Sequence, residues 1–65
     1  MPEGFYRDVT VELSHLGFIF WKVAKGSHEK WKHPETGLVL IVPRNLKSRN
    51  TANAILKDAG SKRRM

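Results

Sequence analysis

Residues 18–33 read FIFWKVAKGSHEKWKH, and this stretch decides the fold because it holds two strand signals around one turn. Residues 18–23 are aromatic or β-branched apart from Lys22 and are too few for a helix, which predicts a strand. Residues 25–27, Lys-Gly-Ser, then reverse the chain, and residues 28–33 return antiparallel to the first strand. The stretch therefore predicts a β-hairpin with a histidine directly after its turn.

Successive side chains of a strand point to opposite faces of the sheet. This alternation divides the second strand into a set that we expect to be exposed and a set that we expect to be covered: His28, Lys30 and Lys32 against Glu29, Trp31 and His33. The tryptophan of the second set is expected to anchor the buried side.

The segments around the hairpin predict a helix, a turn and a third strand. Residues 5–16 place apolar side chains at spacings of four, four and three, which is one stripe of a helix that ends at Gly17. Residues 34–37, Pro-Glu-Thr-Gly, form a turn. The continuous apolar run at residues 38–42 then predicts a strand at the centre or on the covered side of the sheet.

The last third of the chain predicts a second helix. After a basic connection at residues 44–47, Ser48 is a suitable N-cap, and Gly60 is suited to end the helix. Residues 61–65 are expected to form a frayed basic tail. The predicted fold is thus a small α+β domain of α-β-β-β-α order, with both helices on one face of a three-stranded antiparallel sheet. We expect one domain over residues 1–65 with a core at about 5–60.

The charge of the chain favours an anionic partner. Twelve Lys and Arg stand against six Asp and Glu in 65 residues, a formal net charge of +6. Such a charge favours nucleic acid, an anionic membrane or an acidic protein, although a merely soluble basic surface explains it equally well. Membrane binding is disfavoured because the lysines crowd a strand rather than one face of a helix. With no cysteine and no long apolar run, we expect a cytoplasmic protein.

The candidate site is centred on His28. An imidazole both gives and takes a proton near neutral pH. Cleavage of a phosphodiester needs such a group among cations, because the substrate is anionic and its reacting hydroxyl must lose a proton. The competing interpretation is a plain strand-edge histidine among solvated lysines. The four surrounding lysines are Lys22, Lys25, Lys30 and Lys32.

Other residues are candidates for contact with a phosphate backbone. Gly26 would supply a positive φ or let a phosphate approach closely, though a simple hairpin glycine fits equally well. Ser27 could donate to a phosphate oxygen. Arg44, Lys47 and Arg49 lie where a loop and a helix N-terminus could bind phosphate, and they would equally suit acidic groups of a protein partner.

Neither a metal nor a small-molecule cofactor is expected. His28-Glu29 and His33 look like a zincin motif, but that motif needs two histidines four apart on one helical face. Here they are five apart on a strand, and therefore on opposite faces. His33 is more simply interpreted as capping the next turn. Trp21 and Trp31 could stack on unpaired bases, but in so short a chain core packing is the stronger claim, particularly for Trp31.

Five short motifs follow one another along the chain: Leu16-Gly17-Phe18, Lys25-Gly26-Ser27-His28, Trp31-Lys32-His33-Pro34, Val42-Pro43 and Ile55-Leu56-Lys57-Asp58-Ala59-Gly60. Over roughly residues 10–60 this ordered set resembles the HicA toxin family. The resemblance implies a fold like that of double-stranded-RNA-binding domains, mRNA interferase activity and inhibition by a HicB-type antitoxin. It also places the family's essential histidine on His28.

The chain departs from the family's pattern at two places. Some members have a second histidine just after the third strand, where this chain has Arg44-Asn45. Many have arginine about where Lys22 stands. Lysine keeps the positive charge of arginine but lacks its bidentate fork.

We therefore expect a metal-independent endoribonuclease, the toxin of a toxin-antitoxin system, that cleaves mRNA with His28 as general base or acid. Two other classes of protein remain compatible with the sequence. A non-catalytic double-stranded-RNA-binding module needs the basic face but not His28. A structural interaction domain for an acidic protein would neither cleave RNA nor bind it tightly.

Overall fold

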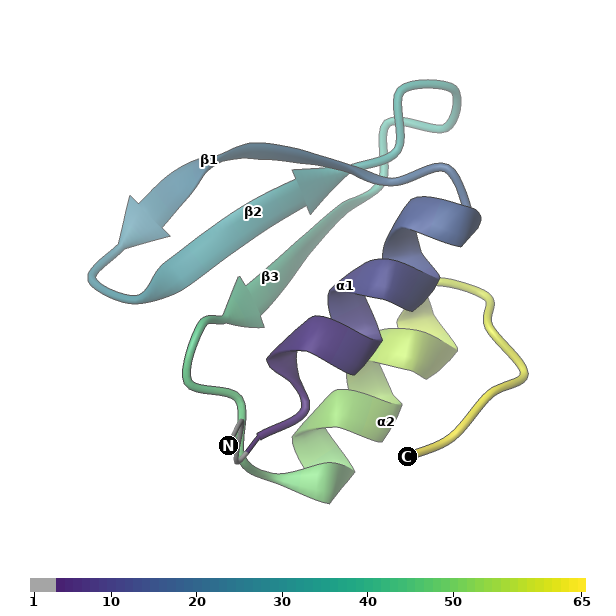
Figure 1. Ribbon diagram of the computed structural model, residues 1–65. Helices are drawn as coiled ribbons and strands as arrows, with labels where there is room; N and C mark the ends of the chain where they lie inside the picture. The colour runs from purple at the N-terminus through teal and green to yellow at the C-terminus, as the bar shows by residue number, and fades with distance from the viewer. Residues whose placement is uncertain (1–3) are drawn as a thin grey trace.

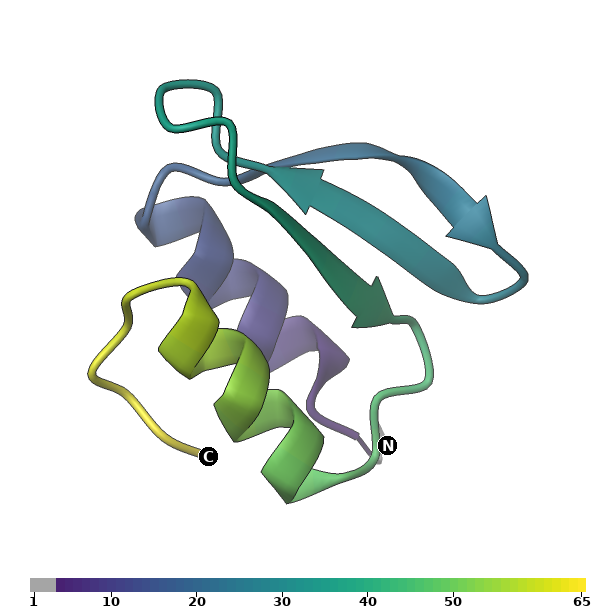
Figure 2. The same ribbon diagram turned by 180° about the vertical axis from the view of Figure 1, so that it is seen from behind.

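The computed structural model describes residues 4–65 and has the predicted α-β-β-β-α order (Figure 1). The three strands form one antiparallel sheet in the order β1-β2-β3. Both helices lie against one face of this sheet, and no described element covers the other face in either view (Figures 1 and 2). The α+β prediction is confirmed. The elements are α1 (Tyr6–His15), β1 (Ile19–Lys25), β2 (His28–Lys32), β3 (Val39–Pro43) and α2 (Arg49–Asp58).

The two helices contribute their predicted apolar stripes to the core. Val9 and Leu13 of α1 have no exposed surface. In α2 the buried side chains follow the helical spacing, at Ala52, Ile55 and Leu56. Ser48 acts as the predicted N-cap, because its hydroxyl oxygen accepts the backbone N–H of Thr51 at 3.2 Å.

The sheet contributes alternate residues to the same core. Trp31 of β2 and Leu40 and Val42 of β3 are buried, whereas Val39 and Ile41 are exposed. The apolar run of the third strand predicted a place at the centre or on the covered side of the sheet. The centre is wrong, because β3 is an edge strand. Its Leu40 and Val42 do face the side that the helices cover. An apolar run does not by itself indicate burial on both faces, since exposed apolar side chains are common on protein surfaces.

The first strand lies outside the core. All seven residues of β1 are exposed, and the β1–β2 hairpin extends beyond the helices (Figure 1). β1 also runs two residues further than predicted, so that Lys25 is its last residue and the turn consists of Gly26 and Ser27. Backbone pairing with β2 holds this strand, and the Phe20 ring meets Trp31 edge-on at 6.1 Å.

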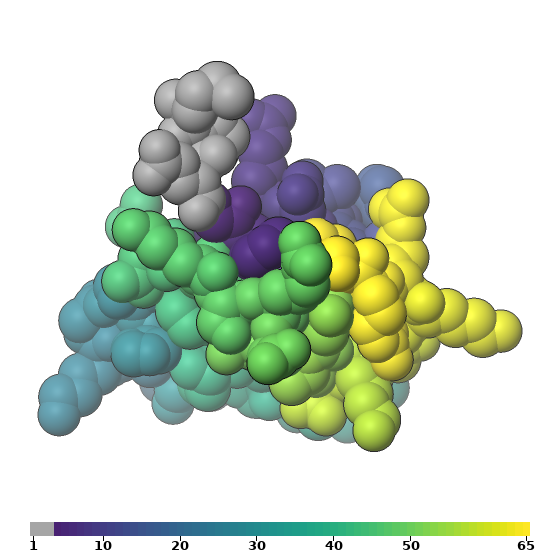
Figure 3. All heavy atoms as spheres, turned by 90° about the horizontal axis from the view of Figure 1, so that it is seen from below, coloured from purple at the N-terminus to yellow at the C-terminus, as the bar shows by residue number. Residues whose placement is uncertain are grey.

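The C-terminal residues 61–65 fold back against the helices instead of fraying (Figure 3). Ser61 is buried, and its hydroxyl donates to a carboxylate oxygen of Glu12 at 2.9 Å. The backbone N–H of Met65 donates to the side-chain oxygen of Asn53 at 2.6 Å. The expectation of a frayed tail is therefore wrong. The composition of residues 61–65 could not show these contacts, because their partners lie in α1 and α2.

His33 joins the end of α1 to the turn after β2. Its Nε2 lies 3.1 Å from the carbonyl oxygen of Leu16 and donates to it, while Nδ1 accepts from the backbone N–H groups of Glu35 and Thr36. The Phe18 ring packs edge-on against the imidazole, with 5.1 Å between centroids. The interpretation of His33 as a structural cap is confirmed. Within the described part of the chain, neither helix is long and apolar enough to cross a membrane.

The glycine after α1 is under a constraint that the glycine after α2 does not share. Gly17 has φ +97°, and a Cβ on it would lie 2.8 Å from Nε2 of His33. Gly60 has a similar φ of +87°, but a Cβ there would meet none of the described atoms within 4 Å. Both positions disfavour residues with a Cβ, by about 1–2 kcal/mol.

We predict that Gly17→Ala lowers the free energy of unfolding by about 1 kcal/mol more than Gly60→Ala does, because it also displaces His33 from the Leu16 carbonyl. Urea denaturation of both variants measures the difference. Equal losses would mean that the His33 contact adds nothing to stability.

Candidate functional site

The face of the sheet turned away from the helices, here called the open face, gathers polar and apolar side chains from all three strands. The register pairs Lys32 with Ile19 of β1 and Val39 of β3, and it pairs Lys30 with Ile41. Glu29 and Trp31 point the other way and are buried, so the predicted alternation of β2 is seen. The register also pairs Lys22 with Lys30 and Lys25 with His28, so the open face consists of Ile19, Trp21, Lys22, Lys25, His28, Lys30, Lys32, Val39 and Ile41.

Three lysine ammonium groups surround the exposed ring of Trp21. The Nζ atoms of Lys22, Lys32 and Lys30 lie 4.4, 5.0 and 5.7 Å from the ring centroid. Each such contact at an exposed site contributes about 0.5–1 kcal/mol. Of the ion pairs among residues 4–65, Arg44–Glu29 and Arg63–Glu12, neither involves these lysines. The Trp21–lysine cluster, formed by Trp21, Lys22, Lys30 and Lys32, thus holds positive charge that an anion could neutralise.

His28 lies at the tip of the β1–β2 hairpin with its imidazole exposed. Its Nδ1 is 3.3 Å from the carbonyl oxygen of Lys25. A carbonyl only accepts hydrogen bonds, so Nδ1 carries the proton in this contact. In the neutral ring, Nε2 is then left with a lone pair and can accept a proton.

The turn before His28 is open and is tied to the loop after β3. Gly26 has φ +58°, and a Cβ on it would meet none of the described atoms within 4 Å. The carbonyl oxygen of Ser27 accepts the backbone N–H of Arg44 at 2.7 Å. Lys25, Gly26, Ser27 and His28 therefore lie together at the hairpin tip, with open space beside the glycine.

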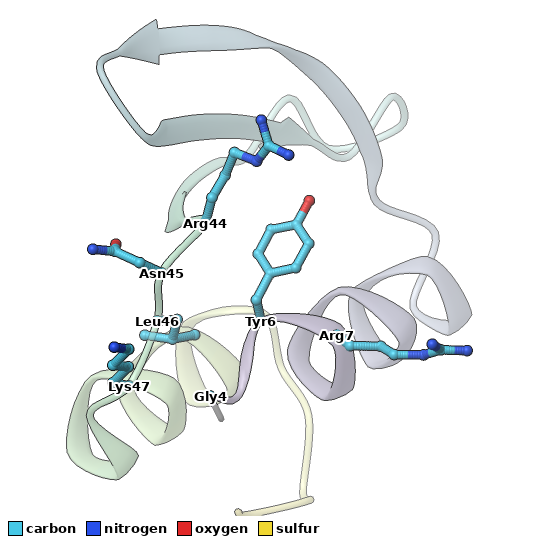
Figure 4. Close-up of a pocket in the computed structure, with 7 residues that line it drawn as sticks. All are labelled: Gly4, Tyr6, Arg7, Arg44, Asn45, Leu46 and Lys47. Carbon is cyan, nitrogen blue, oxygen red and sulfur yellow. The ribbon is translucent and has the colours of Figure 1, made fainter. Parts of the chain in front are cut away.

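Arg44 and Lys47 lie apart from the other predicted contact residues. The Nε of Arg44 is 3.4 Å from a carboxylate oxygen of Glu29, on the helix side of the sheet. Arg44 and Lys47 line a pocket of about 270 Å³ together with Tyr6 and Leu46. Figure 4 shows the Arg44 guanidinium and the Tyr6 hydroxyl extending toward the same space, from the loop and from α1. The structure thus separates the predicted residues into a group on the open face and at the hairpin tip, and a second group at the pocket.

Sequence reasoning assigned no role to Glu29, yet its carboxylate is the centre of a buried network. The Glu29 side chain is 7% exposed. One carboxylate oxygen accepts the Tyr6 hydroxyl at 2.7 Å and the indole N–H of Trp31 at 3.1 Å, and the other faces Arg44. The covered position of Glu29 beside Trp31 was a usable signal for a buried acceptor. Nothing local indicated Tyr6, which lies 23 residues away in the sequence.

The same network perturbs the tyrosine. Burial raises the pKa of Tyr6 above its ordinary value of 10.0, and the hydrogen bond to Glu29 and the negative charge of that carboxylate raise it further. The guanidinium of Arg44 acts in the opposite direction. Among residues 4–65 as a whole, no three side chains of His, Asp or Glu come together in a way that could hold a metal ion.

Comparison with known protein families gives a match over most of the chain. The family model described as the HicA toxin of bacterial toxin-antitoxin systems matches residues 6–61. The match includes both helices, all three strands and the hairpin tip. No curated protein and no solved structure matches the chain.

We predict that Glu29→Ala lowers the free energy of unfolding by about 1–3 kcal/mol, because it leaves the Tyr6 hydroxyl and the Trp31 indole N–H without their acceptor. Glu35→Ala is the matched control, since it removes a carboxylate from an exposed turn and should change stability by less than about 0.5 kcal/mol. Urea denaturation gives both values. Similar effects of the two changes would contradict the role of Glu29.

Tyr6 is the single tyrosine of the chain, so its ionisation can be followed directly by ultraviolet absorbance. We predict a midpoint above pH 10.0 in the folded protein and a normal midpoint in urea. The unfolded chain then loses this proton first, so the free energy of unfolding should fall as pH rises above about 10. Tyr6→Phe should lose this contribution to the fall, because the phenylalanine ring has no proton to release. An unshifted midpoint in the folded protein would refute the proposed environment.

Proposed function

This chain belongs to the HicA toxin family, and from that premise we propose that it is a metal-independent endoribonuclease that cleaves mRNA, with His28 as the proton-transfer group. The observation that supports the proposal best is the geometry of His28. Its imidazole is exposed at the tip of the hairpin, and the contact of Nδ1 with the Lys25 carbonyl leaves Nε2 available to a substrate.

The proposed reaction is an attack of the RNA on itself. Nε2 of His28 takes the proton of a ribose 2′-hydroxyl, and the 2′-oxygen forms a bond to the adjacent phosphorus. The bond from phosphorus to the 5′-oxygen of the next nucleotide breaks. That oxygen leaves with a proton from water or from the imidazolium, and a 2′,3′-cyclic phosphate remains. The step consumes no water and needs neither an oxidant nor a metal-bound nucleophile.

Cationic side chains on both sides of His28 favour this chemistry. Lys25 pairs with His28 across the hairpin, and Lys30 is the next residue of β2 on the open face. Ammonium groups so placed would stabilise the additional negative charge of the pentavalent phosphorane. Gly26 leaves room for the phosphate, and the hydroxyl of Ser27 could donate to one of its oxygens. Lys22 and Lys32 would hold neighbouring phosphates.

Arg44 and Lys47 have a different place in the proposal. The guanidinium of Arg44 faces Glu29 across the sheet from His28, so it is not positioned to replace a second catalytic histidine. Its backbone N–H instead holds the Ser27 carbonyl and steadies the hairpin tip. RNA that continues past the tip toward the pocket would meet both cationic side chains.

Members of the family pair with an antitoxin. For this chain we propose that a HicB-type protein inhibits by laying an acidic surface over His28 and the lysines of the open face. Such a surface would neutralise the charges that attract RNA and block Nε2 at the same time. A cytoplasmic location, as expected from the sequence, would place the toxin with its substrate.

The decisive experiment is incubation of the pure protein with end-labelled mRNA in EDTA. We predict that the wild type cleaves the RNA and that His28→Ala lowers the rate by at least about 10²- to 10⁴-fold. His15→Ala is the matched control, because His15 is an exposed histidine on α1, away from the open face, and its loss should leave the rate unchanged. Circular dichroism of each variant verifies folding.

Full activity of a folded His28→Ala variant would refute the mechanism. Intact RNA with every variant, together with salt-dependent binding, would instead identify a non-catalytic RNA-binding module. Strict dependence of cleavage on an added divalent cation would refute the metal-independent step.

A further inference from the structure

We propose that Trp21 is a stacking platform for an unpaired base, and that the open face therefore binds single-stranded RNA rather than a duplex. The inference rests on the proposed function in taking RNA as the ligand. It goes further by naming the strand state of the substrate and one residue that recognises it.

The structure separates the two tryptophans that the sequence offered as candidates for stacking. Trp31 is 9% exposed, and its indole N–H is bonded to Glu29, so this ring belongs to the core. Trp21 is 44% exposed and takes no part in the buried cluster. An exposed tryptophan ring on a basic sheet is a surface on which a base can stack.

A register shift in β1 determines how Trp21 is presented. Phe20 pairs with Trp31 and Lys22 pairs with Lys30, so Trp21 is the additional residue between two consecutive pairs. Such bulges redirect a side chain and often occur next to functional sites. Phe20 packs on the helix side against Trp31, while Trp21 lies among the lysines of the open face.

The ammonium groups around Trp21 match the chemistry of a nucleotide strand. A base that stacks on the ring brings a phosphate on each side of its ribose, and three ammonium groups lie within 5.7 Å of the ring centroid. Exposed lysines held over a ring can exchange this weak contact for one with a phosphate, which leaves the ring face to the base. The exposed Ile19, Val39 and Ile41 supply an apolar surface around the cluster.

The geometry disfavours a duplex as the preferred ligand. In a paired helix both faces of each base are covered by its neighbours, so the Trp21 ring would have nothing to stack on. A protein that recognises double-stranded RNA by its shape needs cationic side chains for the phosphates but no exposed aromatic ring. Because Trp21, Lys30 and His28 share the open face, a strand stacked on Trp21 would lead along β2 to the proposed catalytic base.

The test uses the His28→Ala protein as parent, so that RNA is bound without being cut. Fluorescence anisotropy measures its affinity for a labelled single strand and for a duplex of the same sequence over a range of salt concentrations. The parent should prefer the single strand. Adding Trp21→Ala should weaken single-strand binding by roughly 5- to 100-fold.

Two control variants separate stacking from charge and from folding. Lys30→Ala should also weaken binding but lower the slope of log affinity against log salt by about one, whereas Trp21→Ala should leave this slope unchanged. Phe20→Ala removes an aromatic ring of similar exposure, 48%, from the opposite face of the same strand and should leave RNA affinity unchanged.

A second readout applies even where Trp21→Ala folds poorly. RNA should quench the tryptophan fluorescence of the parent. Trp21→Phe should lose this quenching, because the remaining tryptophan, Trp31, is buried. It should keep most of the affinity, because phenylalanine still offers a ring for stacking. Persistent quenching in Trp21→Phe would overturn the inference.

The proposal is also overturned by equal affinity for single strand and duplex, by a folded Trp21→Ala variant that binds like its parent, or by a parent that binds no RNA. Failure of the proposed function looks different. A wild type that cuts no RNA, while the parent still binds single strands through Trp21, would refute the nuclease and support the stacking site. A wild type that cuts, with Trp21→Ala affinity unchanged, would refute the stacking site alone.

Discussion

The buried carboxylate of Glu29 is the contact on which the arrangement of the domain depends. It comes from the central strand and accepts donors from α1, from β2 itself and from the loop before α2. A buried carboxylate is costly unless its oxygens are paired, so the three donor groups must stay close to it. The position of the loop follows, since Arg44 is held by its side chain at Glu29 and by its backbone at Ser27.

This arrangement divides the domain into a side that provides stability and a side that is free for binding. The apolar core lies between the sheet and the helices, and most of it comes from α1, α2 and the inward residues of two strands. The open face adds no buried residue to that core. Its lysines, Trp21 and His28 can therefore be selected for what they bind, with little cost in packing.

Local signals in the sequence account for much of this fold. The alternation in β2, Gly17 and the Ser48 cap each depend on a few neighbouring residues, and each is seen in the structure. The Tyr6–Glu29 contact and the docking of residues 61–65 join distant segments, and composition and periodicity do not report such contacts. In the candidate site, strand parity grouped His28 with Lys30, but it could not show that Arg44 faces the other side.

The exposed first strand has a consequence for how copies of this protein meet. An edge strand with unpaired backbone groups and apolar side chains is a template on which a second sheet can add. In β1, two register shifts interrupt the regular ladder, and Lys22 and Lys25 place positive charge along the strand. Interruptions and lysines of this kind discourage edge-to-edge pairing between like chains. The bulge at Trp21 thus also disfavours self-aggregation of the domain through the edge of β1.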